Sequence, residues 1–182
     1  MANVIEKAED YLSSATISHE MLRDKLSEFL AVEKGGLKLY ERALQNVHDP
    51  EVVNKFTTFR EQTRKHESIL IRVMQKLGMD PEYMSNGARL ATEKAEALLK
   101  TMENGLTGKT AEINAIENII LAETKDHADW ELLGKISRQT NDSKIRDALK
   151  DAVSEVEPEE DEHLNWTKEQ MSRLEINAIA TK

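Results

Sequence analysis

Cysteine is absent from the 182-residue chain. This absence excludes disulfides, thiolate metal sites, iron–sulfur clusters and a nucleophilic thiol. Proline and glycine are also scarce, with 3 and 7 residues, and aromatic residues make up only 4% of the chain. Because alanine, leucine, glutamate and lysine are abundant instead, the composition predicts an all-α protein rather than one built on β-sheets.

An excess of positive charge is absent as well, and so are long hydrophobic runs. The chain has 25 Lys and Arg against 34 Asp and Glu, a net charge of −9. Phosphate binding needs a basic surface, so we expect no nucleic acid partner. No window approaches the length of a membrane span, and the opening residues MANVIEKAEDYL contain no apolar signal core. We therefore expect a cytoplasmic protein with no membrane partner.

Apolar residues recur at helical spacing along most of the chain. They predict four long helices and one shorter helix, at roughly residues 18–47, 50–77, 86–103, 110–139 and 143–177. Asp49-Pro50 is a clear helix start, because it combines a capping aspartate with a proline at the first helical position. Pro158 lies inside the last predicted helix and should kink or loosen it.

The lengths of the connections suggest how these helices are arranged. Short links join the first long helix to the second and the third to the fourth, whereas residues of about 78–109 form a long crossover that contains the shorter helix. This pattern is typical of a four-helix bundle with one crossover. We expect an amphipathic segment over residues 1–17, with a short helix at about 4–14, and a bundle domain over residues 18–182.

The two long helix pairs look like a diverged repeat. Its matched residues are Glu33 with Glu123, Tyr40 with Trp130, and His66 with His163. Glu33 and Glu123 both interrupt apolar stripes, where a carboxylate is costly unless it is paired, protonated or bound to a metal. Glu160 and His163 are three residues apart and share one helix face. Carboxylates and imidazoles on four inward stripes suit iron, manganese or zinc.

These residues resemble the ligand pattern of the ferritin-like di-metal carboxylate superfamily, particularly its rubrerythrin-like and manganese-catalase-like branches. In that pattern, two helices each supply a glutamate, often with an aromatic residue seven positions later, and the other two each supply Glu-x-x-His. The resemblance covers roughly residues 18–175. It implies a ferritin-like four-helix bundle with Fe or Mn, or Zn as an alternative, and a set of metal ligands formed by Glu33, His66, Glu123, Glu160 and His163.

Thr63 departs from this pattern, because it stands where the superfamily has a carboxylate. Threonine cannot bridge two cations with negative charge, so the resemblance leaves open whether a second metal binds. Asp126, one turn after Glu123, is an additional candidate ligand, and His127 could also face the site. Two other carboxylates flank the gap, but at unsuitable helical angles: Glu61 and Glu67.

Each candidate also has an ordinary structural explanation. Interior histidines are often hydrogen-bonded to a neighbour, and acidic runs such as residues 155–162 are usually solvated. Aromatic residues such as Tyr40 and Trp130 more often pack in a core than carry electrons, and Asp126 and His127 would more commonly be surface residues. The joint occurrence of five polar residues at matching heights favours metal binding.

Three functions are compatible with these features. The first is a metal-dependent oxidoreductase acting on dioxygen or peroxide, with an external electron donor because the chain lacks a cysteine-rich redox segment. In that case Tyr40 and Trp130 would line the pocket or carry an electron. The second is a non-catalytic bundle with a decayed site that serves assembly or partner binding. The third is iron storage, which needs a closed shell. A homodimer is the expected oligomer, with residues 1–17 as a candidate contact surface.

Overall fold

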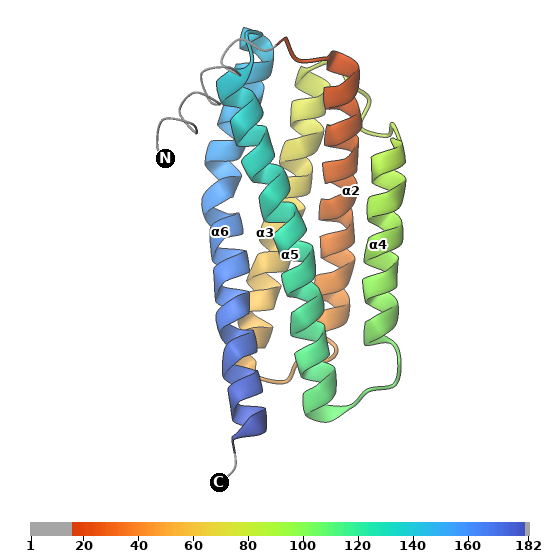
Figure 1. Cartoon of the computed structure of the whole chain (residues 1–182), viewed down its shortest axis with the longest axis vertical. Coiled ribbons are helices and arrows are strands. Elements are labelled where there is room, and N and C mark those ends of the chain that lie inside the picture. The colour runs from red at the N-terminus through yellow and green to blue at the C-terminus, as the bar shows by residue number, and fades with distance from the viewer. Residues whose placement is uncertain (1–15, 181–182) are drawn as a thin grey trace, which may run out of the picture.

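The computed structural model describes residues 16–180, and this part of the chain forms five helices. The prediction of an all-α protein is confirmed, and the helix boundaries agree with the predicted ones to within a few residues. The short helix expected at about residues 4–14 lies outside the described residues. The helices are α2 (His19–Ala43), α3 (Pro50–Lys76), α4 (Asn86–Met102), α5 (Gly108–Gln139) and α6 (Ser143–Ile179) (Figure 1).

Four of these helices surround a common core. Helix α2 packs against α3 and α5, and α6 packs against the same two helices on the other side of the core. Helices α2 and α6 run downward in Figure 1, whereas α3 and α5 run upward. Helix α4 lies outside this group, mainly against α2. It occupies the connection between α3 and α5, where the sequence predicted a crossover containing a shorter helix.

Local side-chain caps explain where the helices begin. The carboxylate of Asp49 accepts a hydrogen bond of 2.9 Å from the backbone N–H of Glu51, with Pro50 at the first helical position. Asp142 caps α6 in the same way through the N–H of Lys144, at 2.8 Å. Helix α6 continues through Pro158, so the proline does not end the helix.

Among the described residues, two large apolar clusters lie at different heights in the bundle, and a small third cluster of alanines lies between α2 and α4. One large cluster includes Leu26, Leu70 and Leu149, near the end where α2 and α6 begin, and the other includes Phe56 and Ile116, near the end where α3 and α5 begin. Both draw on α2, α3, α5 and α6 or their immediate ends. Between the clusters lies a layer of buried polar side chains. The interior is therefore interrupted at mid-height, where the candidate site residues are located.

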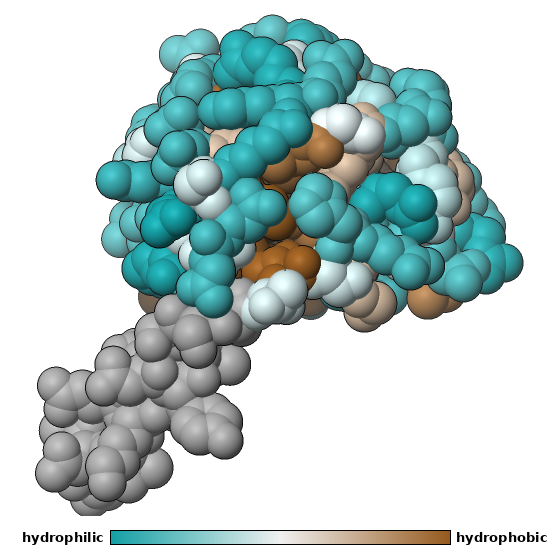
Figure 2. Space-filling model, turned by 90° about the horizontal axis from the view of Figure 1, so that it is seen from above, coloured by the Kyte–Doolittle hydropathy of each residue, from teal (hydrophilic) through white to brown (hydrophobic). Residues whose placement is uncertain are grey.

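The upper end of the molecule is mostly hydrophilic, with a strip of hydrophobic side chains at its centre (Figure 2). Among the helices described, none combines the length and the apolar composition that crossing a bilayer requires.

Two adjacent glycines in α2 have different surroundings. A Cβ atom added at Gly35 would lie 2.8 Å from the Cβ atom of Ala95 in α4, closer than two carbon atoms can approach. One added at Gly36 would lie 3.5 Å from Cγ2 of Thr63, an ordinary contact distance. Gly35 therefore allows the close approach of α2 and α4, whereas Gly36 has room for a methyl group.

This difference predicts opposite effects of two neighbouring substitutions. Gly36→Ala should raise the free energy of unfolding by about 0.5–1 kcal/mol, because alanine restricts the unfolded chain and favours a helix. Gly35→Ala should lower it by about 1–3 kcal/mol, because α4 must move to relieve the overlap. Urea denaturation of both variants measures this. Equal stability of the two variants would contradict the close contact between α2 and α4.

Candidate metal centre

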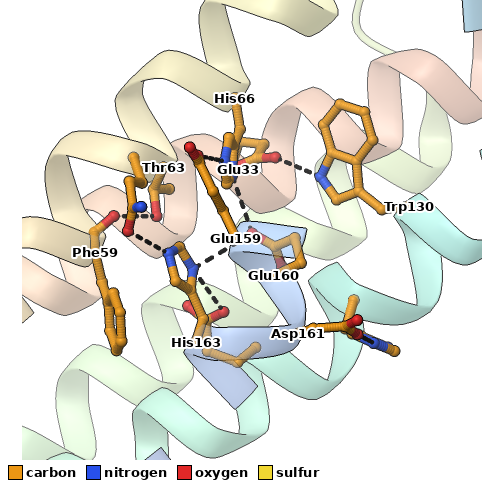
Figure 3. A network of polar contacts seen from close by, with 12 residues as sticks. Glu33, Phe59, Thr63, His66, Trp130, Glu159, Glu160, Asp161 and His163 are labelled. Atoms are coloured by element: carbon orange, nitrogen blue, oxygen red, sulfur yellow. Dashed lines mark hydrogen bonds and ion pairs between the residues drawn. The ribbon is translucent and has the colours of Figure 1, made fainter. Parts of the chain in front are cut away.

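The polar layer contains every residue that the sequence predicted as a metal ligand. Their exposed fractions lie between 0 and 4%, and they come from all four helices of the bundle: Glu33 from α2, His66 from α3, Glu123 and Asp126 from α5, and Glu160 and His163 from α6. Figure 3 shows several of them pointing towards one another. The structure thus brings together residues separated by up to 130 positions in the sequence.

Glu160 lies between the two imidazole rings. Its Oε1 atom is 3.0 Å from Nδ1 of His66 and 3.4 Å from Nδ1 of His163. The Nδ1 atom of His163 is also 3.3 Å from Oε2 of Glu123. The rings are stacked at 26°, with centroids 5.7 Å apart. Both histidines therefore direct Nδ1 towards carboxylate oxygens in the interior of the bundle (Figure 3).

The other ring nitrogens face away from this interior. Nε2 of His66 lies 2.8 Å from Oε2 of Glu159, and Nε2 of His163 lies 3.0 Å from Oε1 of Gln62. Neither Glu159 nor Gln62 is among the site residues predicted from the sequence. A signal was present, because each partner precedes a histidine by four residues and so lies on the same helix face.

Two aromatic side chains hold the glutamates of α2 and α5. The hydroxyl of Tyr40 donates a hydrogen bond of 2.7 Å to Oε1 of Glu123, and the indole Nε1–H of Trp130 donates one of 2.9 Å to Oε1 of Glu33. Each aromatic residue thus reaches the glutamate of the other helix pair. Both rings are buried beside the carboxylates, as expected for residues lining the site, whereas electron transfer through them stays a prediction.

Many buried polar atoms in this layer have no hydrogen-bond partner. The two Nδ1 atoms lie at ion-pair distance from carboxylates, but without the geometry of a hydrogen bond. Unpaired buried polar atoms are rare and costly in proteins. Within the described residues, the unpaired atoms of the layer are Oε2 of Glu33 and Glu123, Oδ1 of Asp126, both carboxylate oxygens of Glu160, and Nδ1 of His66 and His163.

Three of these residues converge closely enough to share one ion. Glu123, Glu160 and His163 each offer a ligand atom, and the three atoms lie within 4.8 Å of one another. Carboxylate oxygens and an imidazole nitrogen are suitable donors for a divalent transition metal. A cation at this position would satisfy atoms that the protein itself leaves unpaired, so the donor set fits a metal ion.

Burial and mutual repulsion disturb the ionisation of the carboxyl groups. Burial raises the pKa of Glu33 well above its ordinary value, and the negative charge of Glu160 raises it further. Burial likewise raises the pKa of Asp126, with a further contribution from the charge of Glu33. The metal-free cluster therefore retains protons on carboxyl groups that would be ionised in water.

Ion pairing with the imidazoles shifts the pKa of Glu160 in the opposite direction to those of Glu33 and Asp126. Burial disfavours the charged forms of both Glu160 and His163, but their ion pairing outweighs it. Close ion-pair contacts with His163 and His66 lower the pKa of Glu160 to about 2, and the contacts of His163 with Glu123 and Glu160 raise the pKa of His163 to about 10. In the metal-free protein, protons on Glu33, Asp126 and His163 therefore reduce the negative charge of the layer, as a bound cation would.

Thr63 lies in the polar layer but its hydroxyl does not face the carboxylates as a free group. Its Oγ1 donates a hydrogen bond of 2.9 Å to the carbonyl oxygen of Phe59, in the preceding turn of α3. This bond occupies the proton of the hydroxyl. Thr63 is 1% exposed. The position on α3 at which the resemblance implies a carboxylate is therefore filled by a small side chain that is hydrogen-bonded to its own helix.

Asp126 lies in the buried polar layer, whereas the other carboxylate and imidazole candidates near Thr63 do not. It is 4% exposed and lies within the cluster, so the expectation that it would more commonly be a surface residue is wrong here. His127 instead faces outward and pairs with Asp161, at 2.8 Å. Glu61 is exposed and pairs with neighbouring arginines, as its helical angle predicted.

The raised pKa of Glu33 predicts a pH-dependent effect of Glu33→Gln on the metal-free protein. The pKa of Glu33 in the folded state lies well above its ordinary value of 4.5, so the folded state binds the proton more tightly than the unfolded state does. The free energy of unfolding of the wild type therefore falls as the pH rises from 4.5 towards the folded-state pKa. The variant lacks this loss. Its free energy of unfolding relative to wild type should rise from pH 4 to pH 8, by about 1.4 kcal/mol for each pH unit between the two pKa values.

Denaturant unfolding at several pH values, after chelator treatment, measures this difference. Glu117→Gln, at an exposed position of α5, is the control and should show little pH dependence relative to wild type. If the difference between Glu33→Gln and wild type stayed constant from pH 4 to pH 8, the carboxyl of Glu33 would not be the perturbed group.

Comparison with known proteins gives one family. Residues 18–157 match the family described as a domain of unknown function, DUF892. The match covers α2 to α5 and the first part of α6, and it ends shortly before Glu160 and His163. No curated protein and no solved structure matches the chain. Because the match spans well over half of the sequence, the chain belongs to the DUF892 family.

Proposed function

We propose that this protein is a ferritin-like metal-binding protein that holds iron or manganese between its four bundle helices and uses it to react with dioxygen or peroxide. One observation carries the proposal: unpaired donor atoms from all four helices are buried together at mid-height in the bundle. A fold does not determine a function, and these buried side chains, not the helices that carry them, indicate metal binding.

The donor set supports a site for two ions. Ferritin-like carboxylate proteins combine two single glutamates with two Glu-x-x-His motifs, which gives four carboxylates and two imidazoles. Here the layer also holds four carboxylates and two imidazoles, because Asp126 adds the group that Thr63 lacks. Oxygen and imidazole donors suit Fe and Mn, and Zn is the main competitor.

Bound iron or manganese would supply the electron exchange with dioxygen or peroxide. The chain's own residues would provide charge, orientation and exclusion of water. The carboxylates balance the cation charge, while Tyr40 and Trp130 fix Glu123 and Glu33 by hydrogen bonds at 2.7 and 2.9 Å. The apolar clusters above and below the layer keep bulk water out. Without cysteine, the electron donor would be external.

The hydrogen bond of Thr63 to its own backbone favours a second candidate, a bundle that binds one ion or none and serves assembly or partner binding. In this case the buried carboxyl groups would remain compensated by protons and by His163. Iron storage would need a closed shell, and a homodimer remains the prediction for the oligomer. Light scattering separates these assemblies.

Metal analysis of freshly purified protein is the first test. We expect about two Fe or Mn per chain by plasma mass spectrometry, in line with four carboxylates and two imidazoles. The double variant Glu123→Ala/His163→Ala should lose most of this metal, since both residues belong to the convergent group, whereas Glu117→Ala at an exposed position should retain it. Metal-loaded wild type should also consume peroxide when a reductant is supplied.

The measured stoichiometry distinguishes the two candidates. About one ion per chain would mean that Asp126 does not replace the missing carboxylate. No Fe, Mn or Zn after loading with each would reject the proposal and favour the partner-binding bundle. Metal retained equally by the double variant would mean that the ions bind outside this layer.

A further inference from the structure

The two buried histidines are held reciprocally across the bundle. Gln62 precedes His66 by four residues on α3, yet it contacts His163 of α6. Glu159 precedes His163 by four residues on α6, yet it contacts His66 of α3. Each helix therefore supplies one histidine and the residue that holds the histidine of the other helix.

These contacts determine which ring nitrogen is free to bind a cation. An ionised carboxylate only accepts hydrogen bonds, so Nε2 of His66 carries a hydrogen and donates it to Glu159. The side-chain oxygen of Gln62 accepts in the same way from Nε2 of His163. When Nε2 keeps its hydrogen, the lone pair available to a metal is on Nδ1. In both histidines Nδ1 is the atom that faces the carboxylates.

Glu159 is itself held in place from the outside. Its Oε1 atom lies 3.0 Å from Nζ of Lys65, and its side chain is 25% exposed. Lys65 also lies 3.5 Å from Glu155, so the lysine keeps an acidic neighbour if Glu159 is replaced. Glu159 therefore connects a fully buried imidazole to the surface, and its replacement leaves the lysine paired.

We propose that Gln62 and Glu159 are positioning residues that aim Nδ1 of His163 and His66 at bound metal. The inference rests on the proposed metal site and adds the residues that orient its ligands. The two acceptors differ in charge, because Gln62 is neutral and Glu159 is a carboxylate. A carboxylate partner makes an imidazole a stronger ligand. The two histidines are therefore unequal donors, although they occupy equivalent positions in the repeat.

Titration of the metal-free protein with Co²⁺, followed by its visible absorption bands, tests this role. Gln62→Met and Glu159→Met keep the side-chain length but remove the strong acceptor. Each should weaken Co²⁺ binding by about 10–100-fold and alter the spectrum, as expected when such partners are lost. Gln62→Glu and Glu159→Gln keep an acceptor and should retain affinity within about 10-fold of wild type.

Two further substitutions control for the change of residue type. Gln75→Met on α3 and Glu169→Met on α6 are at exposed positions and should bind Co²⁺ like wild type. Circular dichroism and thermal melting show whether each variant folds. A second measurement uses the wild type alone: in the Zn²⁺-loaded protein, ¹⁵N NMR should place zinc on Nδ1 and hydrogen on Nε2 of both histidines.

The outcomes separate this inference from the proposed function. Wild type that binds neither Co²⁺ nor Zn²⁺ would reject the metal site and the positioning role together. Wild type that binds them while both folded methionine variants keep its affinity and spectrum would overturn the positioning role alone. Zinc found on Nε2 of either histidine would also overturn it, whether or not the methionine variants fold.

Discussion

The burial of four carboxyl groups at the centre of a helical bundle is the constraint on which the other polar contacts depend. A carboxylate in the interior is costly unless charge or hydrogen bonds compensate it. The protein supplies two imidazoles, a tyrosine hydroxyl and an indole N–H, and it leaves protons on Glu33 and Asp126 through their raised pKa values. The apolar clusters on either side provide the favourable burial that offsets the remaining cost.

Reciprocity between the two helix pairs explains how so many polar groups are accommodated. Tyr40 of the first pair holds a glutamate of the second, and Trp130 of the second holds a glutamate of the first. Gln62 and Glu159 hold the histidines in the same crossed manner. The diverged repeat in the sequence thus corresponds to an approximately two-fold arrangement of contacts, broken where Thr63 occupies the position that Glu160 has in the other helix pair.

The sequence predicts the helices well because caps and periodicity are local signals, as at Asp49 and its following proline. It also predicts most residues of the buried polar layer, because a carboxylate such as Glu33 inside an apolar stripe is conspicuous. It does not reveal the burial of Asp126, since this depends on the rotation of α5 against its neighbours. Glu159 is hidden for another reason: it lies in an acidic run that otherwise faces solvent, and only the packing of α3 and α6 identifies its partner.

The crossed hydrogen bonds also determine when during folding the cost of burial arises. Each of them joins the α2–α3 hairpin to the α5–α6 hairpin, across 83 to 101 residues of chain. While the hairpins are separate, the carboxylates remain hydrated and no desolvation penalty arises. The desolvation penalty is incurred when the two hairpins dock, a step that already has to close a long loop. A divalent cation captured at that moment would compensate the charge of the carboxylates and so lower the barrier to docking.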